Sequence, residues 1–182
     1  DIQKRLAGAM QQASAATDYE SAAVYRDRIR ALAQVQSHQD INVKGLGEAD
    51  AIAIHQGGGQ SCIQVFFFRG GRNYGNCAYF PRHDPNLAAD EVLGPFITQF
   101  YESRIAPAQI LISHDVAERE LVERALASRG GHKVVIFRPR RGAKRKLVEH
   151  ALVNAGEALS RRLAESASQR LILEEVARIF GL

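Results

Sequence analysis

The spacing of apolar positions changes once along this chain of 182 residues, from helical spacing to strand spacing. Over 1–36 apolar residues recur at helical intervals in two blocks, and Asp18 stands between them where an N-cap is expected. One face of the second block carries an aromatic, two alanines, an arginine and an isoleucine: Tyr19, Ala22, Ala23, Arg26 and Ile29. The pattern predicts a short antiparallel helical hairpin.

A polar stretch over 37–49 is expected to be a linker, and residues 50–182 then predict a mixed α/β domain. The segments predicted as strands are 50–56, 61–69, 72–80, 109–113 and 133–137. The segments predicted as helices are 89–102, 116–129 and 144–180. Gly70-Gly71 predicts a two-residue turn between the second and third strands. Three strands in a meander, followed by helix, strand, helix, strand and a long helix, predict the ribonuclease H-like topology.

A nuclease with this topology holds two metal ions with clustered carboxylates. The chain offers Asp50, Asp90 and Asp115, but the body of the first strand carries no acid, since Asp50 stands at its start. Asp90 and Glu91 also suit the beginning of a helix, where negative charge is favourable, and Asp115 can cap the next one. We therefore expect no catalytic or metal-binding residue. The alternative is a divergent metal nuclease that uses Asp50, Asp90 and Asp115.

Composition excludes several other kinds of chemistry. No run of about 18 apolar residues is present, so no membrane span is expected. The six histidines are scattered without cysteine partners at ligand spacing, which argues against zinc, and no cofactor is expected. Cys62 and Cys77 fall on neighbouring predicted strands, and free, buried thiols in a reducing cytoplasm are the default expectation.

A basic run at 138–146 stands between the last predicted strand and the last helix. Its six charges are Arg138, Arg140, Arg141, Lys144, Arg145 and Lys146. Positive charge opposes the dipole at a helix N-terminus, whereas phosphate oxygens are favoured there. The run therefore predicts contact with the DNA backbone that does not depend on base sequence. The alternatives are a solvated loop or pairing with Glu118, Glu120 and Glu123.

Two helices of this length cannot enclose a core by themselves, so the hairpin face is expected to need a partner. Small residues at Ala22 and Ala23 allow close approach, and Tyr19 offers a large anchor. Arg26 and Asp27 are adjacent on the helix, so we expect them to pair across the hairpin or with the partner. The alternatives are that this face packs on its own chain or self-associates.

The second helix resembles the UVR motif, the helical hairpin through which the bacterial excision-repair proteins UvrB and UvrC bind each other. The motif reads aromatic-Glu-x-Ala-Ala-x-x-Arg-Asp-x-Ile. It is matched here by Tyr19, Glu20, Ala22, Ala23, Arg26, Asp27 and Ile29. Several later segments resemble the UvrC family after its UVR motif: 67–71, 99–101, 139–142 with Lys144 and Leu147, and 154–155.

This resemblance implies a middle piece of a UvrC protein: a hairpin that docks on UvrB and an inactive ribonuclease H-like domain. The piece would help to place two flanking nuclease domains for dual incision of damaged DNA. The seven motif residues would carry the docking. The expected partners are therefore UvrB and the DNA backbone.

Overall fold

The computed structural model describes residues 2–39 and 46–180. The chain divides into two compact units, Asp1–Asn42 and Val43–Leu182. Six of the 13 residues of the predicted linker, 40–45, lie outside the described residues. In the described ranges, no helix is long and apolar enough to cross a membrane.

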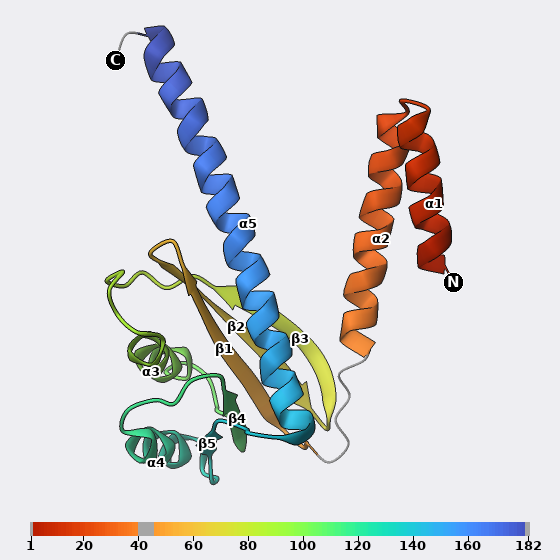
Figure 1. The fold of residues 1–182 in the computed structure, drawn as a ribbon. Helices are drawn as coiled ribbons and strands as arrows, with labels where there is room; N and C mark the ends of the chain where they lie inside the picture. The colour runs from red at the N-terminus through yellow and green to blue at the C-terminus, as the bar shows by residue number, and fades with distance from the viewer. Residues whose placement is uncertain (1, 40–45, 181–182) are drawn as a thin grey trace. The chain divides into compact units, whose positions relative to one another are not determined.

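The first unit is a helical hairpin, as predicted (Figure 1). It consists of α1 (Ile2–Ala15) and α2 (Tyr19–Gln39), so α2 runs past the predicted end at residue 36. Asp18 caps α2, because its Oδ1 accepts a hydrogen bond of 3.1 Å from the Ser21 backbone N–H. The hydrogen bond to Ser21 also lowers the pKa of Asp18.

The second unit is built on a mixed sheet of five strands in the order β3-β2-β1-β4-β5. The strands are β1 (Ala49–Gly57), β2 (Gln60–Arg69), β3 (Arg72–Tyr79), β4 (Gln109–Ile112) and β5 (Val135–Phe137). The first three pair antiparallel, and β4 and β5 continue the sheet in parallel. Gly70 and Gly71 form the β2–β3 turn at φ 58° and 76°, which glycine adopts without strain. The predicted ribonuclease H-like topology is confirmed.

Helices cover both faces of this sheet (Figure 1). They are α3 (Ala89–Phe100), α4 (Arg119–Gly130) and α5 (Gly142–Phe180). Side chains alternate along β1: Ile52 and Ile54 join the apolar core with α3 and α4. The opposite face carries Ala49, Ala51 and Ala53, and these small side chains leave room for α5 to pack closely on the sheet. The sheet therefore fixes the beginning of α5 relative to β4 and β5.

Two local expectations were wrong. Helix α4 begins at Arg119 rather than at 116, because Glu118 adopts a left-handed conformation (φ 50°) that a helix cannot include. Both cysteines are free, but only Cys62 is buried. Cys77 lies on β3, the edge strand, whose residues are largely open to solvent.

Candidate partner-binding and nucleic-acid-binding sites

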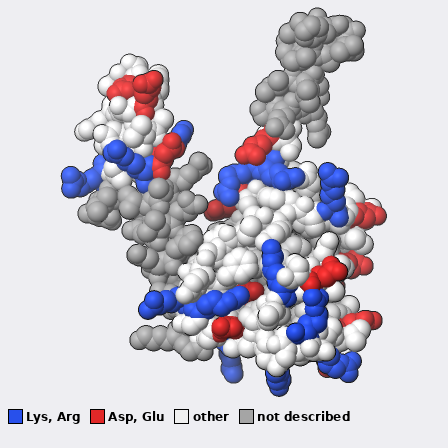
Figure 2. Space-filling view, turned by 180° about the vertical axis from the view of Figure 1, so that it is seen from behind, with Lys and Arg blue, Asp and Glu red and all other residues white. Residues whose placement is uncertain are grey.

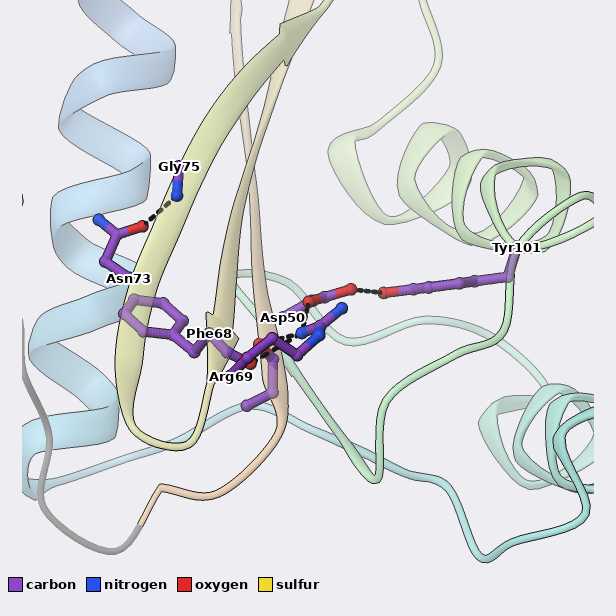
Figure 3. A network of polar contacts seen from close by, with 7 residues as sticks. Asp50, Phe68, Arg69, Asn73, Gly75 and Tyr101 are labelled. Carbon is purple, nitrogen blue, oxygen red and sulfur yellow. Dashed lines mark hydrogen bonds and ion pairs between the residues drawn. The ribbon is translucent and has the colours of Figure 1, made fainter.

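Asp50, the first acid of the alternative nuclease site, is engaged in the interior. The residue is 1% exposed, and both of its side-chain oxygens have partners (Figure 3). Arg69 Nη1 lies 2.8 Å from Oδ1, and the Tyr101 hydroxyl donates a hydrogen bond of 2.7 Å to Oδ2. Burial raises the pKa of Asp50, although the hydrogen bonds from Arg69 and Tyr101 oppose that shift. This carboxylate ties β1 to the end of β2 and to the end of α3.

The other two acids lie elsewhere. Asp90 is exposed in the first turn of α3, and Asp115 is exposed in the loop after β4. Asp50 pairs in register with Ile110, whereas Asp115 follows Ile110 by five residues, beyond the opposite end of the short strand. Within the described ranges, no three His, Cys, Asp or Glu side chains are placed to hold a metal ion. The arrangement therefore does not favour the alternative nuclease site.

Half of the predicted basic run converges on one cavity of about 670 Å³ at the carboxyl ends of β4 and β5. Arg138 and Arg140 come from the β5–α5 loop and Arg145 from the first turn of α5. Arg119, at the start of α4, joins them across the cavity. We call the cavity lined by these four residues the arginine cleft. In mixed sheets, the carboxyl ends of parallel strands are the usual place for a ligand.

The remaining members of the run lie outside this cleft. Arg141 and Lys146 are exposed and do not line it. Lys144 is half-buried, and its ammonium donates a hydrogen bond of 2.6 Å to Gln109 Oε1. The same ammonium lies 5.2 Å from the centre of the Phe137 ring. Lys144 therefore joins α5 to the sheet, a role that the sequence did not indicate.

Two acids partly offset the positive charge of the arginine cleft. Arg145 Nε donates a hydrogen bond of 2.6 Å to Glu149 Oε1, and Arg138 lies 3.8 Å from Asp115. The expected alternative pairing with Glu118, Glu120 and Glu123 is not what the structure shows for this run. Glu123 instead accepts a hydrogen bond of 2.6 Å from the Ile136 backbone N–H. Four arginines against two acids leave the cleft net positive.

His114 stands between Ser113 and Asp115, two residues that line this cleft, and its pKa is lowered. Burial lowers its pKa first, and the nearby positive charge of Arg138 lowers it further. Its Nδ1 lies 2.9 Å from the Ser113 hydroxyl, which accepts a hydrogen bond of 3.1 Å from the Ile54 backbone N–H. Ser113 and His114 therefore fix the loop after β4.

On the hairpin, Tyr19 is 69% exposed, and Glu20, Arg26 and Asp27 are exposed as well. Ala22, Ala23 and Ile29 are half-buried. Val24, which the motif does not mark, is also half exposed on α2. The motif residues thus offer an exposed anchor, small neighbours and charge.

We expected Arg26 and Asp27 to pair across the hairpin or with the partner rather than with each other. The last part of that expectation was wrong. Arg26 Nε donates a hydrogen bond of 3.0 Å to Asp27 Oδ1, so these neighbours bind each other. A long arginine side chain can reach its neighbour along the helix surface even though adjacent helix positions point in different directions. The contact with Asp27 raises the pKa of Arg26.

On the face that Figure 2 presents, charge does not form one broad patch among the described residues. Figure 2 shows basic and acidic side chains interspersed on the face that it presents. The net charge of +4 is therefore less informative than local clusters. The arginine cleft is such a cluster.

Two family models match this chain. Residues 48–162 match the UvrC Ribonuclease H-like domain, and residues 2–35 match the UvrB/uvrC motif. Among similar relatives are proteins named UvrABC system protein C from Chelativorans sp. (strain BNC1) and Rhodospirillum rubrum, each 56% identical. A third, from Brucella abortus (strain 2308), is 55% identical. All three alignments cover 100% of this chain.

The chain spans 28% of the first two relatives and 30% of the third. A solved structure from Bacteroides thetaiotaomicron, described as having an actin-like ATPase fold, aligns with 69% of this chain and 49% of that chain at 8% identity. Its TM-score of 0.35 is too low to bear on fold or function.

Proposed function

The chain belongs to the UvrC family, and we propose that it serves bacterial nucleotide excision repair as a non-catalytic docking module. In this proposal the hairpin docks on UvrB, and the ribonuclease H-like unit helps to position the nuclease domains that incise damaged DNA. The observation that carries the non-catalytic part is that Asp50, the first acid of the nuclease-like sheet, is bound by Arg69 and Tyr101. The docking part is supported by the exposure of Tyr19 on the hairpin.

Three features support the non-catalytic role. Asp50 has both oxygens occupied, Asp115 lies past the far end of β4, and the described side chains gather no metal-binding cluster. Two-metal hydrolysis requires carboxylates that converge on both ions. We expect no cleavage of damaged duplex DNA by the 182-residue chain with magnesium or manganese. Cleavage that Asp115→Ala abolishes would overturn this part and restore the nuclease alternative.

The match to the UvrB/uvrC motif and the exposed Tyr19 support docking. Gel filtration of the chain mixed with the C-terminal helical hairpin of UvrB tests it. Co-elution of the two is expected. If the chain elutes as a dimer with the UvrB hairpin left free, the face serves self-association instead.

The basic run supports contact with DNA phosphates, because Arg140 and Arg141 are exposed and have no ion pair within the described part of the chain. Affinity should fall steeply with salt, since counterions are released on binding. Reversing Arg140 and Arg141 to Glu should make that dependence shallower. The matched control reverses Arg161 and Arg162, an adjacent pair farther along α5, and an equal effect there would contradict a specific role for the run.

A further inference from the structure

The arginine cleft has an apolar wall as well as positive charge. Phe137, Val148 and Leu152 line it together with the arginines. Lys144 lies 5.2 Å from the centre of the Phe137 ring, so a cation already lies near that aromatic ring. A site that bound only phosphate would not need this wall. A site for a whole nucleotide would use both parts.

We propose that the arginine cleft binds an unpaired DNA strand, one or two nucleotides at a time, with phosphates on the arginines and a base on the Phe137 side. Sites for single strands combine a positive groove with an aromatic platform on which bases stack. The inference rests on the proposed DNA contact of the basic run and deepens it, since it adds a choice between unpaired and paired DNA.

The size of the cleft supports this choice. Its volume of about 670 Å³ is within the range of sites that enclose a small ligand. In a duplex the bases are stacked and paired inside, so a duplex can present only phosphates and groove edges to such a cavity. An unpaired nucleotide can place its phosphate and its base in the cleft together.

The two acids of the cleft, Asp115 and Glu149, allow a ligand to bind reversibly. Arg138–Asp115 and Arg145–Glu149 are exposed pairs, with side-chain exposures between 52% and 69%. Exposed ion pairs contribute little stability, so a phosphate that forms forked hydrogen bonds can displace a carboxylate from an arginine. Arg119 Nε lies 3.9 Å from Glu123 Oε1, a distance at which the ion pair is weak. The cleft thus keeps its arginines oriented before a strand binds.

Fluorescence anisotropy tests the proposal with the full 182-residue chain, a short labelled oligothymidylate, and the same strand annealed to its complement. Phe137→Leu keeps an apolar side chain and removes the ring. We expect it to weaken single-strand binding about fivefold or more and to leave duplex binding unchanged. Phe80→Leu is the matched control, because Phe80 also lies beneath a cation, Arg162 at 4.4 Å, but does not line the cleft.

Arg119→Gln gives a second readout at a residue outside β5, whose side chain is 45% exposed. This substitution should weaken single-strand binding. It should also make the slope of log affinity against log salt concentration shallower by about one. Equal losses on single strand and duplex in both variants would overturn the single-strand assignment and leave the proposed backbone contact standing. No salt-dependent binding to either DNA would overturn the backbone contact and this inference together.

Discussion

Asp50 shows how burial changes what an acid residue does in this molecule. A carboxylate withdrawn from water is costly unless other groups replace its hydration, and Arg69 and Tyr101 supply that replacement. A metal ion would have to displace both. The sequence placed Asp50 correctly near the start of the first strand, but the Tyr101 hydroxyl comes from 51 residues away, and no local pattern predicts that contact.

Removing the Tyr101 hydroxyl should therefore destabilise the fold. Tyr101→Phe leaves Asp50 Oδ2 without its donor in a buried position, and we expect the free energy of unfolding to fall by about 1–3 kcal/mol. Urea denaturation measures it. Tyr74→Phe is the control, since Tyr74 is 72% exposed on β3. A loss for Tyr74→Phe as large as that for Tyr101→Phe would contradict the importance of the buried hydrogen bond.

The two cysteines should differ sharply in reactivity. Burial raises the pKa of Cys62 to about 11, so at about pH 8 only roughly one Cys62 thiol in a thousand is the reactive thiolate. Cys77 is exposed on the edge strand. Alkylation with iodoacetamide, mapped by mass spectrometry, should label Cys77 in the folded chain and both residues after denaturation. Labelling of Cys62 at the rate of Cys77 in the folded chain would contradict its burial.

At the scale of elements, the sequence predicted those whose signals are local. Asp18 caps α2 by accepting a hydrogen bond from Ser21, three residues later. Gly70 and Gly71 connect β2 to β3 because glycine adopts positive φ without strain. The start of α4 was missed because Glu118 adopts a left-handed conformation that non-glycine residues rarely show. Arg119 was missed as a site residue because it enters the cleft from a separate helix, and only the sheet topology brings α4 and α5 to the same edge.

The first turns of α5 allow a test of how the acids control the arginine cleft. Glu149→Gln removes the negative partner of Arg145, so we expect affinity for a short single strand to rise at low salt. Glu157→Gln is the matched control, since Glu157 pairs with Arg161 on the same helix at 3.9 Å but does not line the cleft. Anisotropy titrations of the two variants compare them. If both raise the affinity equally, general charge and not the cleft governs binding.

At the scale of the whole molecule, two compact units carry separate proposed tasks. The hairpin offers Tyr19 and its neighbours to a protein partner, and the ribonuclease H-like unit offers the arginine cleft to DNA. The family resemblance and the fold could be predicted from sequence, because motif spacing and strand order are written along the chain. The residues that line the cleft could not be predicted, because the cleft depends on the carboxyl ends of β4 and β5 lying side by side in the sheet.

Calorimetric titration of the 182-residue chain with the C-terminal helical hairpin of UvrB tests the central claim most directly. We predict micromolar or tighter binding that Tyr19→Ala weakens by more than about 1.4 kcal/mol, a factor of ten. Tyr74→Ala, which removes a similarly exposed tyrosine from the other unit, should leave the affinity unchanged. No binding, or equal losses for Tyr19→Ala and Tyr74→Ala, would contradict the docking role of the hairpin.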